Sequence, residues 1–579
     1  MTKYIVVVGG VISGVGKGVT TASIGKILKE YGYSVTAVKI DPYINVDAGT
    51  LRPTEHGEVW VTDDGGEIDQ DLGNYERFLD IDVPKMNNLT TGQVYKHVID
   101  KERRGEYLGQ TVQFIPHIPE EIKKRVKDAG KGYDFVLVEI GGTVGDYENI
   151  PFLFAMKEME RELGINSFIY VLVTYLFAPR HIEEMKTKPT QQAIRMLTES
   201  SGIFPDFILC RSAEKLDQVR KKKIEIYANI SADNVISAPD VKSIYQIPLN
   251  FHKEKIGEKI LKKFDLPKGK KATFSNWKKW TDNIVSPKET IKIAIVGKYV
   301  NSGSFTLTDS YLSIKEALTH AGAHLSTRVE IEWFNAESLK KNPKNVELLK
   351  KYSGILIPGG FGKNGIEGKM IAINYARLHN VPFLGLCYGM QLALIEFARN
   401  VCGMKDANTT EVDLNTPYPI IDFMPLQKEL IKNHEYGGTM RLGGYGAIIS
   451  KDSIVYDLYK SLKRIEKDKE KIKNFAKDKE HKFRLGKFNK DKDIMILERH
   501  RHRYEVNPKY IERLEKKGIV FSGFHQRLDG ARLMEFIELK DHKFFVATQA
   551  HPEFKSRLND PSPLFYGFVK SCMKKKEKK

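Results

Sequence analysis

A cysteine, a histidine and a glutamate in the second half of the chain have the spacing that nucleophilic catalysis requires. Cys387 in GLCYGMQ follows the apolar run VPFLG at a glycine-flanked turn, where a strand would give way to a helix. A helix N-terminus favours the reactive thiolate, and the pattern is that of G-x-S-x-G with sulfur as the nucleophile. His551 in QAHPEF would be the neighbouring base. If this segment is extended, Glu553 shares its face and can orient the imidazole.

An oxyanion hole is the remaining requirement of such a site, and PGGFG at 358–362 offers glycine N–H groups at the end of the preceding apolar run. A lone cysteine is more often an inert core residue, and a lone histidine is more often structural. PGGFG, GLCYG and HPE in this order favour a cysteine hydrolase instead.

A glycine-rich loop near the N-terminus predicts a phosphate site. GGVISGVGKGVTTASIG, residues 9–25, follows an apolar strand and enters a helix, so backbone N–H groups and Lys17 can face phosphate oxygens. The loop departs from G-x-x-x-x-G-K-[ST], because Gly18 follows the lysine and Val11 stands at the first glycine position. A hydroxyl for the metal would come from Thr20 or Thr21, or a carboxylate would replace it. The alternative is a glycine turn that only lets a helix pack closely on a strand.

Several acids follow predicted strands of the same half. Lys39 and Asp41 end the second strand, at the edge where doubly wound sheets bind ligands. Glu139 ends the strand YDFVLVE just before GGTVGD, and EIDQDLGNYERF carries Asp69 and Asp71. Magnesium with ATP would need oxygen ligands of this kind, although a solvated or ion-paired acid is the alternative for Asp71.

The elements that must position these residues alternate between apolar strands and helices. YIVVVGG, SVTAVKID, YDFVLVEIGG, FIYVLVT and DFILCRS are typical of parallel strands buried on both faces, and a second series starts at IKIAIVGKY, 291–299. We therefore expect an α/β protein of two domains, each with a mostly parallel sheet flanked by helices. The first would span 1–265 and the second 291–579, with a linker at 266–290 that contains Trp277 and Trp280.

The composition of the 579 residues, with 41% hydrophobic and 29% charged, is ordinary for a globular enzyme. No apolar run is long enough to span a membrane, the N-terminus does not resemble a signal peptide, and four cysteines suit a reducing compartment. A cytoplasmic enzyme is expected.

The net charge of +18 lies largely in the segment 459–493, which looks like an insert in the second domain, and in the tail MKKKEKK. Both look like a solvated surface helix or a disordered stretch, so we expect no nucleic-acid partner and no membrane partner.

The chain resembles the CTP synthase family along almost its whole length. The matching stretches are SGVGKG, KIDPYINVDAGT, HGEVWVTDDGGEIDQDLGNYERF, EIGGTVGDYE, KTKPTQ, PGGFG, GLCYGMQ, GGTMRLG, ERHRHRYEVN and HPEF. The resemblance implies a P-loop, Rossmann-like amidoligase domain joined to a class I glutamine amidotransferase domain. The first would use ATP and Mg²⁺ to phosphorylate O4 of UTP, and no organic prosthetic group is expected. The second would release ammonia from glutamine through a Cys387 thioester, into an internal passage.

The resemblance also implies roles for individual residues. Those expected at ATP are Ser13, Gly14, Val15, Gly16, Lys17, Gly18, Lys39, Asp71, Asp240 and Val241. Those expected at UTP or the inhibitor CTP are Ser13, Asp146, Tyr147, Glu148, Lys186, Thr187, Lys188, Pro189, Thr190, Gln191 and Lys223. Those expected at glutamine are Gly360, Tyr388, Gly389, Met390, Gln391, Glu411 and Arg503, and the magnesium ligands would be Asp71 and Glu139.

Family members respond to GTP as activator and CTP as feedback inhibitor, and they form homotetramers (dimers of dimers) and filaments. Three features depart from the family pattern. Asn364 replaces an arginine in the lid associated with GTP, and an amide cannot make the forked contact of a guanidinium. The resemblance does not cover the insert at 459–493, and the loop NSGSFTLTDSYLSI is longer than usual.

Two alternatives remain, one a neighbouring enzyme and one a protein without enzymatic activity. One is another ATP-dependent amidoligase with a fused glutaminase, such as a cobyrinate-type enzyme, whose substrate would need neither KTKPTQ nor GGTVGDYE. The other is a P-loop scaffold protein that keeps an inactive glutaminase fold.

Overall fold

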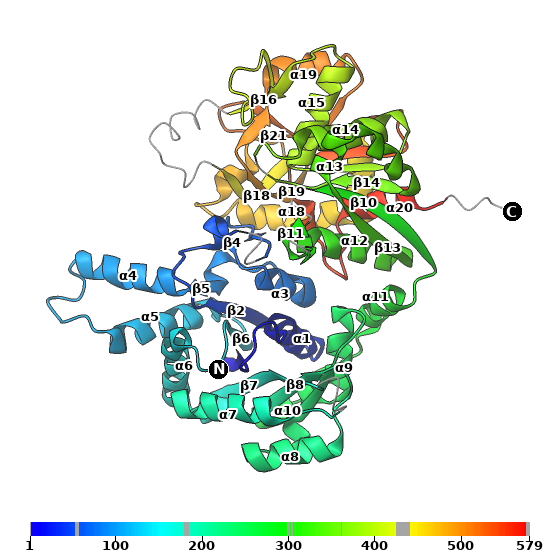
Figure 1. Ribbon diagram of the computed structural model, residues 1–579. Coiled ribbons are helices and arrows are strands. Elements are labelled where there is room, and N and C mark those ends of the chain that lie inside the picture. Colours follow the sequence, from blue (N-terminus) through cyan, green and yellow to red (C-terminus); the bar gives the residue numbers. More distant parts are fainter. Residues whose placement is uncertain are drawn as a thin grey trace. The chain divides into compact units, whose positions relative to one another are not determined.

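The computed structural model describes residues 2–52, 57–178, 184–297, 301–302, 305–306, 308–360, 362–423 and 440–574 (Figure 1). The chain divides into two compact units. Unit 1 consists of Met1–Leu51 and Glu67–Thr281, and unit 2 consists of Arg52–Gly66 and Asp282–Lys579. No helix in the described residues is both long and apolar enough to span a bilayer.

Unit 1 is built on a seven-stranded sheet in which all paired strands are parallel. The strand order is β5-β2-β6-β1-β7-β8-β9. The strands are β1 (Lys3–Gly9), β2 (Val35–Asp41), β5 (Asn88–Thr90), β6 (Phe135–Ile140), β7 (Phe168–Tyr175), β8 (Phe207–Ser212) and β9 (Val235–Pro239). The central strands are apolar and buried on both faces, as the sequence predicts.

Helices pack against this sheet in two groups. Helix α1 contacts both α3 and α9, and α5, α6, α7 and α8 contact in succession. The helices of unit 1 are α1 (Lys17–Glu30), α3 (Asp71–Leu79), α4 (Thr91–Arg103), α5 (Phe114–Ala129), α6 (Ile150–Leu163), α7 (Lys188–Ser201), α8 (Gln218–Ala228), α9 (Ile247–Lys253) and α10 (Ile256–Lys263). The short strand β4 (Glu67–Ile68) precedes α3.

Unit 2 contains a nine-stranded mixed sheet with the order β13-β10-β14-β15-β23-β22-β21-β18-β19. The parallel half comprises β13 (Thr327–Asn335), β10 (Glu289–Gly297), β14 (Gly354–Ile357), β15 (Phe383–Leu386) and β23 (Phe545–Thr548). An antiparallel half continues it with β22 (Arg532–Glu538), β21 (Val520–Gln526), β18 (Arg441–Ile449) and β19 (Ile494–His502). The α/β fold class is confirmed, whereas the antiparallel extension was not predicted.

The remaining elements of unit 2 surround this sheet. Its helices are α12 (Leu312–Leu325), α13 (Ala336–Lys341), α14 (Ile366–Leu378), α15 (Tyr388–Asn400), α17 (Ile454–Ser461), α18 (Arg464–Phe475), α19 (Pro508–Glu515) and α20 (Pro563–Cys572). A small sheet joins β16 (Ala407–Thr409), β17 (Tyr418–Phe423) and β20 (Tyr504–Val506), and two short strands are β11 (Asn301–Ser302) and β12 (Phe305–Thr306).

A short segment from the first half of the chain belongs to unit 2. The apolar pattern predicts that all of 1–265 lies in one domain, but Arg52–Gly66, which includes β3 (Trp60–Val61), packs in unit 2. Asp63 Oδ1 lies 2.5 Å from Nε of the buried Arg499, and the Trp60 ring meets Phe554 edge-on with centroids 5.1 Å apart. A buried ion pair and a buried aromatic contact therefore decide the location of this segment, and neither leaves a pattern in the sequence.

The interval proposed as a linker contains helix α11 (Ser275–Val285), and the division between the units falls within this helix. Trp277 is 1% exposed, donates from Nε1 to the carbonyl O of Tyr245 at 2.8 Å and packs in unit 1.

The Lys-rich insert at 459–493 is structured in this protein. Helix α18 buries Ile472, which joins a small core with Leu485, Met495 and Leu497. The prediction of a surface helix therefore holds for its outer side only. Several of the features discussed above lie outside the described residues: His56, which begins HGEVW, 298–299 of IKIAIVGKY, 303–304 and 307 of the long loop, Phe361, 437–439 of GGTMRLG and the tail residues 575–579.

Candidate active sites

Cys387 stands on a strained turn between β15 and α15. Its φ is 49° and its ψ is −102°, an uncommon conformation for a residue with a side chain. The flanking glycines permit close packing: a Cβ at Gly389 would lie 2.4 Å from the carbonyl O of Ile357. The geometry is that of a nucleophile elbow, in which Cys387 is the N-cap residue of α15.

His551 and Glu553 form a hydrogen-bonded pair beside the cysteine. Nδ1 of His551 lies 2.7 Å from Oε1 of Glu553, and the His551 backbone N–H donates to the carbonyl O of Arg499 at 2.7 Å. The sequence predicts that Glu553 orients His551 because both lie on one face of an extended segment. The two side chains do pair, but the predicted conformation is wrong, because residues 552–555 form a 3₁₀ turn.

The imidazole of His551 is held in its charged form. Burial disfavours the charge, but the Glu553 carboxylate and Cys387 outweigh burial and raise the pKa of His551 to about 10. The ring also lies against Cys387, since a Cβ placed at Gly359 would be 2.8 Å from His551 Cε1 and 3.5 Å from Cys387 Cβ. Together these groups can supply a thiolate and an imidazolium.

The remaining residues expected at glutamine fall into two sets. Glu411 accepts from the Gly362 N–H at 2.6 Å, and the Tyr388 hydroxyl donates to the Gly362 carbonyl at 3.2 Å, so both border the PGGFG turn that includes Gly360. Arg503 and Glu411 both act electrostatically on Tyr504, whose pKa is raised mainly by burial to about 12.

The second set does not present its side chains to the site. Met390 lies in the hydrophobic core with no exposed surface. Gln391 is 2% exposed and donates to the carbonyl O of Tyr504 and to Oε1 of Gln549. Their positions after Cys387 place them inside α15, where helix packing directs the side chains inward.

The phosphate loop of unit 1 joins β1 to α1. Gly14 and Gly16 have φ values of 71° and 82°, which favour glycine. Lys17 donates from Nζ to the carbonyl O of Gly142, and a Cβ at Gly9 would lie 2.7 Å from Nζ. Burial, with a smaller effect of Lys39, lowers the pKa of Lys17. Ser13 is exposed on the loop, whereas the Val15 side chain is buried.

Three of the predicted acids converge on Lys39 in unit 1. Lys39 Nζ forms ion pairs with Asp71, with Glu139 Oε1 at 2.9 Å and with Asp41 Oδ1 at 3.9 Å. Burial opposes the Lys39 charge, but these carboxylates raise its pKa, and burial raises the pKa of nearby Asp69 to about 7. The described residues contain no group of three or more His, Cys, Asp or Glu side chains that could hold a metal ion unaided.

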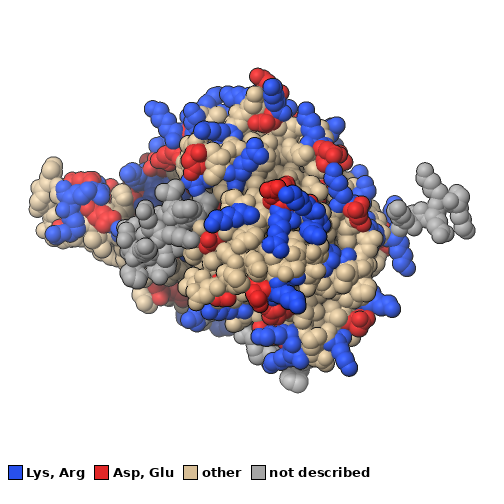
Figure 2. Space-filling view, turned by 90° about the horizontal axis from the view of Figure 1, so that it is seen from above, with Lys and Arg blue, Asp and Glu red and all other residues tan. Residues whose placement is uncertain are grey.

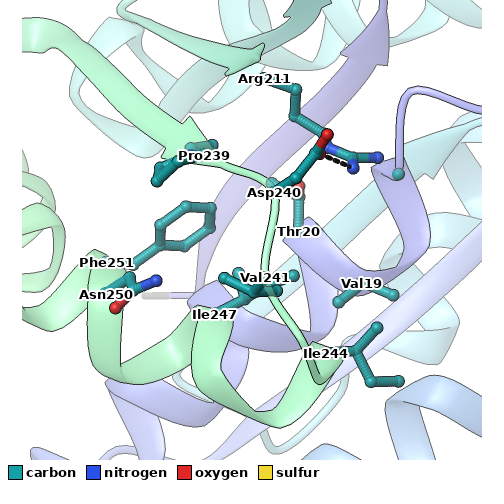
Figure 3. Close-up of a pocket in the computed structure, with 12 residues that line it drawn as sticks. Val19, Thr20, Arg211, Pro239, Asp240, Val241, Ile244, Ile247, Asn250 and Phe251 are labelled. Carbon is teal, nitrogen blue, oxygen red and sulfur yellow. Dashed lines mark hydrogen bonds and ion pairs between the residues drawn. The ribbon is translucent and has the colours of Figure 1, made fainter. Parts of the chain in front are cut away.

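A cavity of about 260 Å³ opens beside the phosphate loop (Figure 3). Asp240 and Val241 line it, together with Thr20 of α1. Arg211 also lines the cavity and forms an ion pair with Asp240 at 2.6 Å. Arg211 is not among the residues predicted at the nucleotide, although its position at the end of the predicted strand DFILCRS is a signal that could have identified it. Thr21, the other hydroxyl considered for a metal, is completely buried.

The residues expected at the pyrimidine nucleotide are only partly brought together. Asp146, Lys188 and Pro189 line a second cavity of about 510 Å³, and Asp146 accepts from the Thr143 N–H at 2.7 Å. Thr190 instead is buried and donates to the Thr174 hydroxyl at 3.0 Å, which does not fit a side-chain contact to a ligand.

The other pyrimidine candidates lie outside the lining of that second cavity. Lys186 pairs with Glu184 at 2.8 Å, and Lys223 is exposed on α8. Tyr147 is 77% exposed, and Glu148 follows it in the chain. Thr187 directly precedes Lys188, and Gln191 lies three residues after Lys188 on α7.

Comparison with known proteins assigns the two halves of the chain to two different families of domain. Residues 3–266 match the family model described as CTP synthase N-terminus, and residues 306–571 match Glutamine amidotransferase class-I. The chain is similar to CTP synthases of Pyrococcus furiosus (49% identity) and Pyrococcus abyssi (48%), in each case over 100% of this chain and 99% of the relative. A third relative, the CTP synthase of Methanocaldococcus jannaschii, is 47% identical over 100% of this chain and 99% of its own.

Among solved structures, a glutaminase domain of a Trypanosoma brucei CTPS with bound acivicin is 31% identical. It covers 49% of this chain and 93% of its own, with a TM-score of 0.40.

These findings define a glutamine-hydrolysing ligase, in which a P-loop unit is joined to a class I amidotransferase unit. The chain belongs to the CTP synthase family. Its activity is the glutamine-dependent synthesis of CTP, as its sequence predicts.

Proposed function

We propose that unit 2 hydrolyses glutamine with a Cys387–His551–Glu553 triad. The Cys387 thiolate attacks the side-chain carbonyl carbon of glutamine, and His551 protonates the departing ammonia as the C–N bond breaks. Water then attacks the thioester carbonyl carbon with His551 as base, and the C–S bond breaks to release glutamate. The His551–Glu553 hydrogen bond of 2.7 Å is the observation that carries this assignment.

The glutamine itself would lie beside the PGGFG turn. Backbone N–H groups at Gly359 and Gly360 are the candidates for stabilising the oxyanion. Glu411 would receive the α-ammonium group of glutamine and Arg503 its α-carboxylate. The side chains of Met390 and Gln391 would make no contact with the glutamine, because they are turned into the interior.

In unit 1 we assign the phosphate loop and the adjoining cavity to ATP. Glycine N–H groups and Lys17 would hold the phosphates, and the apolar cavity lined by Val241, Ile244 and Phe251 would receive the adenine. Arg211, paired with Asp240 as Figure 3 shows, would border the same cavity. UTP would be phosphorylated on O4 and then aminated by ammonia with loss of phosphate.

The residues present fit a magnesium ion that accompanies ATP. The carboxylate oxygens of Asp71 and Glu139 are hard donors, and both contact the ammonium group of Lys39, so they lie close enough together to share an ion. Two carboxylates completed by substrate phosphates and water are typical of Mg²⁺. Bound there, the ion would neutralise phosphate charge during transfer.

We further propose CTP feedback through Asp146, Tyr147 and Glu148, activation by GTP that is weakened by Asn364, and a cytoplasmic homotetramer able to form filaments. The pyrimidine assignment is supported by the cavity that Asp146 and Lys188 line. Lys363 could partly replace the missing guanidinium.

The transfer of nitrogen from glutamine to CTP can be tested with an isotope label. Purified protein given UTP, ATP, Mg²⁺ and glutamine labelled with ¹⁵N in its side-chain amide should yield CTP that carries ¹⁵N on its exocyclic nitrogen. If ATP were consumed without CTP, and an added carboxylic acid were amidated instead, the protein would be another amidoligase of the same architecture. No nucleotide or glutamine turnover at all would indicate a scaffold protein.

A further inference from the structure

The side chain of Gln549 contacts Cys387, the proposed nucleophile of unit 2. Gln549 stands two residues before His551 in QAHPEF, and none of the sequence motifs assigns it a role. Gln549 directly follows strand β23 and is completely buried. Its Nε2 lies 3.6 Å from Cys387 Sγ, within the range of an N–H···S hydrogen bond. We propose that Gln549 is a catalytic residue of the glutaminase, which donates this hydrogen bond to the Cys387 thiolate. The inference rests on the proposed function of Cys387 as the nucleophile.

The orientation of the amide follows from its neighbours. The carbonyl O of Tyr504 can only accept, so the Gln391 atom 3.0 Å away is Nε2, a donor. The same Nε2 lies 3.2 Å from the Gln549 side chain, which must therefore present Oε1 there. The other end of the Gln549 amide, which faces sulfur, is then Nε2. The carbonyl O of Tyr504 thus fixes the orientation of the Gln391 amide, which in turn fixes the Gln549 amide with its N–H donor toward sulfur.

The backbone adds to this fixation. The N–H of Gln549 donates to the carbonyl O of Glu535 on β22 at 2.9 Å, and the Cys387 N–H donates to the carbonyl O of Thr548 at 2.7 Å. Nucleophile and donor are thereby attached to the same strand end. Gln391 acts through Gln549 and is a positioning residue.

A donor at this place favours charge on sulfur. Cys387 is 2% exposed, so few water molecules can solvate a thiolate, and a fixed N–H group has a larger effect than in water. The thiolate accepts a hydrogen bond more strongly than the thiol or the thioester does. Gln549 would therefore stabilise sulfur before attack, and again when the C–S bond breaks and the electron pair returns to Sγ.

The proposal is tested by alkylation of Cys387 with iodoacetamide across pH in the full-length protein, followed by mass spectrometry. In Gln549→Met, which keeps the length of the side chain but lacks the donor, the midpoint of the profile should rise by about one to two pH units. Gln549→Glu should raise it further, because its carboxylate adds negative charge beside sulfur. Gln391→Leu should cause a smaller rise, and Gln526→Met, on β21, should leave the profile unchanged.

Steady-state kinetics separate a chemical role from a structural one. Glutamine-dependent kcat should fall about tenfold or more in Gln549→Met, while ammonia-dependent CTP formation shows that the chain is folded. Coincident alkylation profiles for wild type, Gln549→Met and Gln549→Glu, with glutamine kcat within twofold, would overturn the inference. If Gln549→Met were misfolded, an unshifted profile in Gln391→Leu would do the same.

The proposed function fails by a different result. If Cys387→Ala still used glutamine, Cys387 would not be the nucleophile, and the role proposed for Gln549 would have no basis. Loss of glutamine use in Cys387→Ala, together with unshifted profiles in the glutamine variants, would refute only the role of Gln549.

Discussion

The charge of a single imidazole is set by its neighbours in unit 2. Glu553 and Cys387 raise the pKa of His551 to about 10, against the opposing effect of burial. His551 therefore keeps its proton across the neutral range. In the proposed reaction this proton goes to the departing ammonia, and His551 would lose it to solvent only as the pH approaches about 10.

Glu553→Gln should move that alkaline limit to lower pH. The amide keeps the shape of the side chain but lacks the negative charge that favours the imidazolium, so the proton is lost earlier as pH rises. Glutamine-dependent kcat should also fall by about 10²–10⁴-fold, as when the orienting acid of a catalytic triad is neutralised. The measurement is glutamine hydrolysis as a function of pH. Alkaline limbs that coincide for variant and wild type would show that Glu553 does not set the charge.

Substitution of Gly359 tests the position of the His551 ring, because it adds a methyl group without changing any charge. In Gly359→Ala the new methyl group would stand 2.8 Å from His551 Cε1, so the imidazole must move away from Cys387. We expect glutamine-dependent kcat to fall by about 10²-fold, since small misplacements of reacting groups are costly.

Gly360→Ala is the matched comparison, because among the described residues a Cβ there would meet only Lys369 Nζ, at 3.9 Å. Its loss of glutamine-dependent kcat should be clearly smaller than that of Gly359→Ala. Equal losses in the two variants would contradict the described position of His551.

At the level of elements, the sequence predicted what apolar patterning controls. Parallel strands such as β1 and β6 are apolar and buried on both faces, and they were placed correctly. Strand β19, IMILERHRH, was missed because its charged residues are buried in pairs, as with Arg499 and Asp63. Such a strand looks polar in the sequence. The cysteine turn and the HPEF segment were found from local motifs, whereas Gln549 meets Cys387 only through the fold.

The Lys-rich insert has a structural role that its composition conceals. Arg484 is 9% exposed and donates to the carbonyl O atoms of Asp63 (2.7 Å) and Asp64 (3.2 Å). It thereby fastens the segment Arg52–Gly66 within unit 2.

Replacing this guanidinium should weaken unit 2. Arg484→Met keeps the apolar stem but leaves the two carbonyl groups without a charged donor, and should lower the free energy of unfolding by about 1–3 kcal/mol. Chemical denaturation followed by tryptophan fluorescence measures it, since Trp60 lies in the fastened segment. Lys482→Met, an exposed neighbour in the insert, is the control. Equal stabilities for the two variants would mean that Arg484 does not fasten the segment.

For the whole molecule, the formal net charge of +18 is a poor guide to function. On the face shown in Figure 2, Lys and Arg side chains are intermixed with Asp and Glu. Part of the excess lies in the insert, where Arg464 is buried and paired with Asp468 and Asp560. Fold and family membership followed from motifs spread over both units, and those motifs assign separate chemistry to each unit.

In the proposed reaction, unit 2 supplies ammonia to a synthetase in unit 1 that can also accept ammonia from solution. The most direct measurement compares CTP formation by wild type and Cys387→Ala with glutamine and with ammonium chloride at alkaline pH. Cys387→Ala should lose glutamine-dependent activity by at least about 10³-fold and keep ammonia-dependent activity within about twofold of wild type. Retained glutamine use, or loss of both activities in a correctly folded variant, would contradict this division of labour.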